Sequence, residues 1–144
     1  MPDKLIEFLR ARKGPPPNRE LLDEWLEAIR KLYDEIKAWL KEAKAEGLAE
    51  YLDGDTAITE TTLGTYPAPV LQLIFGDRIV LVRPVGRFAL AAKARIDILH
   101  GSKKTMMVRD SEGTWSISPV GSTREQFLPL SKDTFSEAIE ALLS

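Results

Sequence analysis

The 144-residue chain contains no cysteine and only one histidine, His100. Without cysteine there are no disulfides, thiolate nucleophiles or cysteine-bound metals. With a single histidine, a zinc site has to rely on carboxylate ligands, which is uncommon. No apolar run is longer than five residues, far short of the about 20 that a membrane-spanning helix needs. We therefore expect no metal, no cofactor and no membrane segment.

Neither sign of charge dominates the composition. The chain has 20 basic and 22 acidic residues, a formal net charge of −2. Residues 56–119 carry 8 basic and 5 acidic side chains, an excess too small to predict nucleic-acid binding. The N-terminus has Asp3, Lys4 and Glu7 where a signal peptide has an apolar core. We expect a cytoplasmic protein, in a bacterial-type cytoplasm or an equivalent reducing compartment.

The N-terminal segment differs from the rest of the chain. Residues 2–13 have a short apolar side and predict a helix, which Gly14-Pro15-Pro16-Pro17 then ends. Consecutive prolines lack N–H donors and favour the polyproline conformation, which is typical of a stiff spacer. We therefore predict an N-terminal helix and proline-rich spacer at 1–17 and a single α+β domain at 18–144.

A long amphipathic helix is predicted at 19–46. Apolar residues recur there every seven positions, and further ones, including Trp25 and Trp39, lie three and four positions later. The stripe covers about three-sevenths of the helix surface, which favours a helix packed on a sheet or in a bundle. Gly47 ends or bends this helix, and 48–52 adds a further turn or two before a turn at 53–55.

From Thr56 onward apolar residues alternate with polar ones, which predicts β-strands. We expect strands at about 56–62, 69–75, 78–84, 88–99, 104–110 and 114–118, and then a helix at 132–143 that Ser131 caps. Short connections such as Gly76-Asp77 and Gly101-Ser102-Lys103 require antiparallel neighbours. The predicted fold is α+β, an antiparallel β-meander of five to six strands. One long amphipathic helix in the N-terminal half packs on one face, with short helices at both termini.

The alternation also predicts which side chains share a face of the sheet. If Ile98 pairs with Met106 and Val108 with Trp115, these four lie on the buried face. The hydrated face then carries Met107, Ser116, Ser118 and a charged row: Lys93, Arg95, Asp97 and Arg109. Such a row either keeps the sheet soluble by cross-strand pairing or recognises a protein or an anionic ligand. Aromatic residues, which an RNA-binding sheet needs on that face, are expected inside.

Three short motifs resemble functional sites only superficially. His100 lies at a predicted hairpin tip, without an orienting partner or a cavity for a general base. Asp53-Gly54-Asp55 with Glu60 departs from the calcium-loop pattern after its second acid. Gly101-Ser102-Lys103-Lys104 lacks the glycine-rich segment and the helix of a phosphate loop. We therefore expect no enzyme.

The length of the predicted helix suggests a second subunit. Its 28 residues span about 42 Å, whereas strands of six to eight residues span about 20–27 Å. Either the terminal helices at 2–13 and 132–143 cover the surplus apolar stripe, or a second copy does. Our functional prediction is a non-enzymatic protein-interaction domain, of an adaptor, inhibitor or immunity type, that forms a homodimer and binds a further protein partner.

An alternative prediction is a carrier of small apolar ligands. Its pocket lies between the helix and the sheet and is lined by Trp25, Trp39, Phe75 and Trp115. Pockets of this kind are mostly apolar with a few polar anchors.

Overall fold

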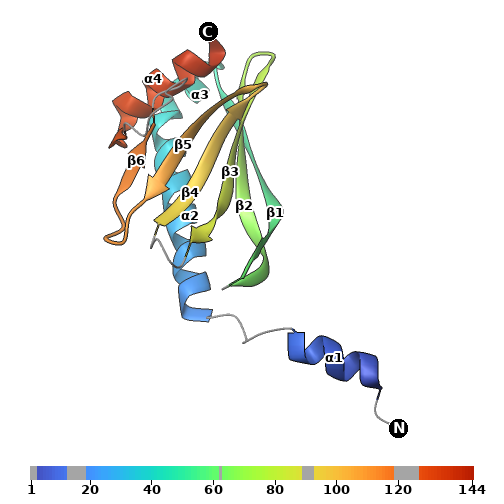
Figure 1. Ribbon diagram of the computed structural model, residues 1–144. Coiled ribbons are helices and arrows are strands. Elements are labelled where there is room, and N and C mark those ends of the chain that lie inside the picture. The colour runs from blue at the N-terminus through green and yellow to red at the C-terminus, as the bar shows by residue number, and fades with distance from the viewer. Residues whose placement is uncertain (1–2, 13–18, 62, 89–92, 119–126) are drawn as a thin grey trace.

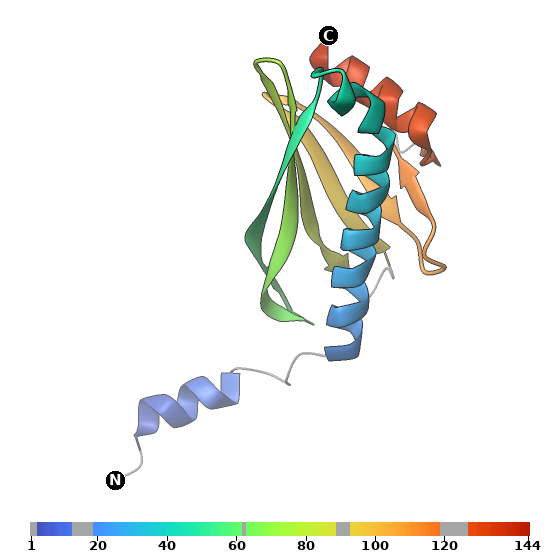
Figure 2. The same ribbon diagram turned by 180° about the vertical axis from the view of Figure 1, so that it is seen from behind.

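The computed structural model describes residues 3–12, 19–61, 63–88, 93–118 and 127–144. One antiparallel sheet of seven strands, ordered as in the chain, lies against a long helix (Figures 1 and 2). The described helices lie on one side of this sheet or beyond its end, and none crosses its other side. The α+β fold with an antiparallel meander is therefore confirmed.

The element bounds are as follows. The helices are α1 (Lys4–Arg12), α2 (Arg19–Trp39), α3 (Lys41–Ala45) and α4 (Lys132–Leu143). The strands are β1 (Glu50–Glu60), β2 (Gly64–Phe75), β3 (Arg78–Phe88), β4 (Lys93–His100), β5 (Lys103–Arg109), β6 (Trp115–Ile117) and β7 (Leu128–Pro129).

The core lies between α2 and the inner face of the sheet, which is the face toward α2. Trp25, Ile29 and Ile36 of α2 are completely buried there, as are Leu71 and Ile96 of the sheet. Burying a side chain of this size contributes about 1.5–3 kcal/mol. The apolar stripe of α2 therefore determines which face of the sheet is the inner one.

The predicted helix at 19–46 is interrupted at Leu40 and ends earlier than its predicted extension. Gly47 has a positive φ of 74°, and the N–H groups of Gly47 and Leu48 donate to the carbonyls of Lys44 and Ala43. This pairing is the Schellman motif, which terminates a helix. The chain then enters β1 at Glu50, so the predicted helical turn at 48–52 and the predicted turn at 53–55 are wrong.

Helix α4 covers the C-terminal end of α2. Its predicted cap is confirmed, because the Ser131 hydroxyl accepts the Thr134 N–H within a capping box. The Phe135 ring lies 5.4 Å from the Trp39 ring, and both belong to the core or pack against it. The surplus apolar stripe of α2 is therefore covered within one chain. Helix α1 takes no part in this cover, since Leu5 is 62% exposed.

The predicted register of β5 is wrong by one residue. Ile96 pairs with Met107, and Met107 pairs with Ile117, which places Met107 on the inner face and Met106 on the other. The cause is the hairpin, because Gly101, with a φ of 57°, lets two residues make the turn where three were expected. A one-residue slip exchanges the faces of a whole strand. The inward positions predicted for Ile96, Ile98, Trp115 and Ile117 are confirmed.

The predicted strand at 88–99 is two strands. Phe88, the last residue of β3, pairs antiparallel with Lys93, the first residue of β4. The sequence has four alanines at 89, 91, 92 and 94, and the first three lie outside the described residues. Ala94, which is described, is buried.

The sheet divides between β2 and β3. Their pairing runs from Phe75 opposite Arg78 to Leu71 opposite Val82 and then stops. If the same register continued for two more residues on each strand, Pro69 would lie opposite Pro84. Proline has no N–H to donate, so two prolines facing each other cannot continue a ladder. We call this division the fork.

Side chains bridge the fork in place of backbone hydrogen bonds. The Tyr33 hydroxyl of α2 lies 2.8 Å from the carbonyl oxygen of Pro69 and 3.3 Å from that of Val82, one on each side. Farther along, the Glu60 carboxylate of β1 accepts the Arg87 N–H of β3 at 2.7 Å. Burial, and secondly the charge of Asp53, raises the pKa of Tyr33 above its ordinary value. The hydroxyl therefore stays protonated as a donor.

A buried hydrogen-bonded chain supports this second bridge. The Trp25 indole N–H donates to the Tyr66 hydroxyl at 3.0 Å, and the Tyr66 hydroxyl donates to Glu60. Burial raises the pKa of Tyr66, and the hydrogen bond to Glu60 raises it further. Gly86 leaves room for the carboxylate, since a Cβ there would lie 3.0 Å from a Glu60 oxygen.

Candidate functional site

The outer face of the sheet, opposite α2, is not covered by any described helix (Figure 1). Strand pairing places on it the side chains that alternate with the buried ones. We define the outer face by these residues: Leu52, Gln72, Ile74, Ile79, Leu81, Arg83, Arg95, Asp97, Leu99, Lys104, Met106 and Val108.

Apolar side chains form cross-strand contacts over this face. Ile74 pairs with Ile79, and Leu81 pairs with Leu99. Ile79 is 53% exposed and Leu52 is 55% exposed, although both are large apolar residues. Single exposed apolar residues are common, but a contiguous apolar area is typical of an interaction surface.

A charged pair lies within this apolar area. Arg95 donates to Asp97 through Nε at 2.8 Å and through Nη2 at 3.2 Å. The Asp97 residue is only 5% exposed, although no described helix covers this face. Its cross-strand partners are Arg83 on β3 and Met106 on β5. Neighbouring side chains therefore shield the carboxylate and leave the Arg95 side chain, 31% exposed, as the accessible member of the pair.

The predicted row of charged residues is only partly brought together. Arg95 and Asp97 share the outer face as predicted, and the side chain of Lys93 lies outside the described residues. Arg109 is on the inner side, because the register slip of β5 places it opposite Ala94 and Trp115. Its inclusion in the hydrated row is wrong.

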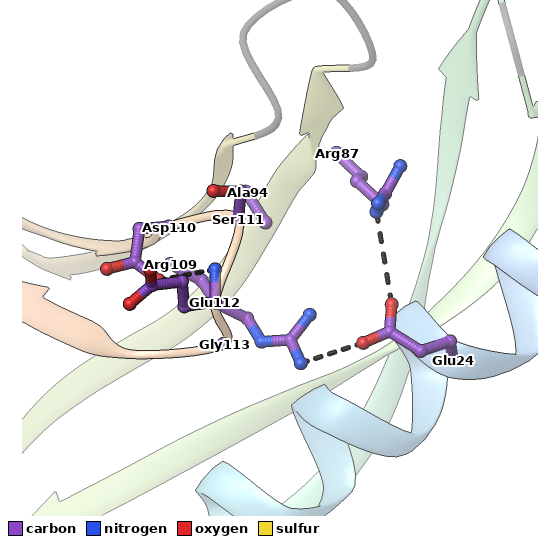
Figure 3. A pocket seen from close by; sticks show the side chains of 8 residues that line it. All are labelled: Glu24, Arg87, Ala94, Arg109, Asp110, Ser111, Glu112 and Gly113. Atoms are coloured by element: carbon purple, nitrogen blue, oxygen red, sulfur yellow. Dashed lines mark hydrogen bonds and ion pairs between the residues drawn. The ribbon is translucent and has the colours of Figure 1, made fainter.

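Arg109 instead belongs to a second polar site, at the N-terminal half of α2. Its Nη2 lies 2.7 Å from Glu24 Oε1, while Arg87 Nε lies 4.0 Å from Glu24 Oε2. Figure 3 shows both arginines pointing toward the one carboxylate. They border a cavity of about 170 Å³ whose other lining residues are Ala94, Asp110, Ser111, Glu112 and Gly113.

Sequence reasoning missed this second site. Its three charged side chains come from α2, β3 and β5 and are separated by more than twenty residues at each step. Periodicity relates only neighbours in the chain, and the slipped register pointed Arg109 the wrong way. With the two-residue turn at Gly101 recognised, Arg109 is expected on the α2 side.

The four aromatic residues of the predicted ligand pocket fall into separate contacts. Trp25 stacks on Trp115 with ring centroids 6.3 Å apart, whereas Trp39 contacts Phe135. Trp25 is completely buried, and Phe75 packs at the margin of the core. None of these four residues lines the cavities beside Arg87, Lys37 and Arg83.

His100 and Asp53, from the remaining short motifs, each contact another element of the fold. His100 ends β4, and its Nδ1 lies 3.1 Å from the carbonyl oxygen of Ile79. Asp53 pairs with Lys37 of α2 at 2.9 Å. In the described part of the chain, no three histidine, aspartate or glutamate side chains gather closely enough to hold a metal ion. Over the same residues, no helix has the length and apolar content required to cross a bilayer.

Comparison of the chain with protein-family models, with curated proteins and with solved structures finds no match.

Proposed function

We propose that this chain is a non-enzymatic protein-interaction domain that binds its partner through the outer face. The observation that supports this most directly is an apolar sheet face that the described helices leave open, while the same helices bury the inner face thoroughly. The arginine of the Arg95–Asp97 pair lies in its middle. Aromatic and arginine anchors within apolar surroundings are typical of the energetically important centres of interfaces.

The charges on the outer face favour a partner with acidic groups. Arg83, Arg95 and Lys104 are basic, and Asp97 is the one acid in the set, already paired with Arg95. At the margin, Glu50 is engaged by Lys44 of α3. An apolar surface edged with carboxylates complements this face, because opposite charges guide encounter and orientation.

The proposed partner is a different protein rather than a second copy. Self-association was expected because the stripe of the long helix exceeded the sheet, and α4 accounts for that surplus through Phe135 and Trp39. Two outer faces placed together also bring Arg83, Arg95 and Lys104 of both copies close to one another. Like charges juxtaposed in an interface disfavour it.

The test is quantitative affinity capture from a lysate of the native host with matched variants. Arg83→Glu and Ile79→Asp change exposed positions of the outer face, and Arg30→Glu makes the same charge change on the exposed side of α2. We expect both outer-face variants to lose a set of proteins that wild type and Arg30→Glu retain, with unchanged circular dichroism. Recovery of the same proteins by all four contradicts the proposal.

A further inference from the structure

The cavity beside α2 collects two guanidinium groups that are remote in the sequence. The Arg87 and Arg109 side chains are 22% and 19% exposed, so each is largely withdrawn from solvent at the cavity (Figure 3). Guanidinium groups bind carboxylate and phosphate oxygens through paired donors. Two of them around one space make a site that suits an oxyanion.

Arg87 has unused donors. Its closest carboxylate oxygen, Glu24 Oε2, is 4.0 Å from Nε, which is beyond hydrogen-bond distance. Among the described residues, no acceptor lies within hydrogen-bond distance of its guanidinium group, although the backbone N–H of the same residue donates to Glu60. No buried side-chain nitrogen or oxygen of the described residues lacks a partner, so the unpaired donors of Arg87 are in contact with solvent and can bond an anion that enters the cavity.

Glu24 occupies the position that the acceptor of a ligand would take. Its carboxylate bonds Arg109 at 2.7 Å, yet its side chain is 47% exposed. An ion pair this exposed contributes little to stability, because solvent screens it. A ligand that bonds both arginines can therefore displace Glu24 at small cost, and the glutamate side chain can turn into solvent.

The carboxylates of the β5–β6 turn weaken the binding of an anion in the cavity, because they carry negative charge beside it. The Asp110 Oδ1 accepts the N–H groups of Glu112 and Thr114, each at 2.9 Å, so this carboxylate is engaged by its own turn. Glu112 is exposed to solvent. Their charges oppose an anion, but solvent screens them more than it screens the largely buried arginines.

We propose that the cavity lined by Arg87 and Arg109 binds a small oxyanion with two negative charges, in competition with Glu24. Two charges match the two arginines that Glu24 releases. The volume of about 170 Å³ admits a phosphate group or a short dicarboxylate and excludes larger ligands unless they extend into solvent. This site is distinct from the outer face, and neither proposal depends on the other.

The experiment titrates the full chain with inorganic phosphate and, separately, with malonate, at low ionic strength near neutral pH. The arginine side-chain Nε–H signals of Arg87 and Arg109 report binding by NMR, and calorimetry gives the affinity. We expect saturable shifts of both signals with at least one anion. The anion that binds more tightly identifies the ligand as a phosphate or a dicarboxylate.

Three variants test the roles of the residues. Glu24→Gln removes the competing charge, and we expect up to about fivefold tighter binding. Arg109→Gln removes a charged donor, and we expect at least about tenfold weaker binding. Arg30→Gln, on the exposed side of α2, is the matched control and leaves the affinity unchanged.

Two results overturn the proposal. One is the absence of saturable shifts with both anions in wild type and in Glu24→Gln. The other is weaker binding by Glu24→Gln than by wild type, which makes Glu24 a structural tie rather than a competitor. Both results come from proteins with an intact arginine pair, so neither depends on the folding of Arg109→Gln.

Discussion

Replacing Tyr33 with phenylalanine tests whether side chains hold the fork together. The ring packs within the core, and the hydroxyl is the atom group that reaches Pro69 and Val82 across the fork. Tyr33→Phe keeps the ring and removes only this hydroxyl. Both carbonyl oxygens then lose their donor, and the tyrosine is too deeply buried for water to take its place easily.

The expected loss of stability follows from the burial of these groups. A buried polar group left without its hydrogen-bond partner costs about 1–3 kcal/mol. For a chain of 144 residues, a change of 2 kcal/mol lowers the melting temperature by about 4–8 °C. We expect the loss to be local first, so that amide hydrogen exchange increases in β1 and in the part of β2 beyond the fork.

Urea unfolding followed by circular dichroism measures the global effect, and hydrogen-exchange mass spectrometry measures the local one. Tyr51→Phe is the matched control, because no hydrogen bond of the Tyr51 hydroxyl is found in the described residues while its ring lies near Lys37 and Lys44. Equal stabilities of Tyr33→Phe and Tyr51→Phe, with equal exchange beyond the fork, refute the reasoning.

Two further outcomes are expected. Because Tyr33 and Tyr66 have raised pKa values in the folded state, the unfolded chain loses these protons first as the pH rises above about 10. The free energy of unfolding should therefore fall above this pH by up to about 1.4 kcal/mol per pH unit for each tyrosine, and Tyr33→Phe should remove the contribution of one of them. A wild-type urea midpoint that does not change over this pH range argues against protonated bridges. Asp97→Asn should lower the unfolding free energy by about 1.5–3 kcal/mol, because a shielded charge-assisted pair is lost. Asp53→Asn, in the exposed pair with Lys37, should change it by under about 1 kcal/mol, and equal effects of the two substitutions would show that shielding is unimportant.

Much of the fold could be predicted because it depends on local patterns. The stripe of α2 and the alternation in β4 and β6 each relate residues a few positions apart, and burial then selects one face. The capping residue Ser131 and the short turn at Gly76 also have local signals. These features determine the meander and the placement of the long helix on it.

The features that could not be predicted depend on single turns or on distant residues. The run Met106-Met107-Val108 is apolar on both faces, so only the turn at Gly101 decides which methionine faces inward. The fork depends on Pro69 meeting Pro84, which requires the β2–β3 register to be known first. The Glu24, Arg87 and Arg109 cluster requires the helix position, the β5 register and the sheet curvature together.

The fork divides the sheet into two parts that share a backbone ladder only from Phe75 opposite Arg78 to Leu71 opposite Val82. Beyond Leu71 and Val82, no continuous ladder joins the end of the β1–β2 hairpin to the rest of the sheet. A tyrosine hydroxyl and a glutamate carboxylate bridge the gap, and Ile58, Leu63 and Tyr66 pack this end into the core with α2. Because Pro69 and Pro84 offer no N–H groups, another strand cannot readily fill the opening. The position of the hairpin end therefore depends on side-chain packing and on these bridges, whereas the strands from β3 onward are positioned by backbone pairing.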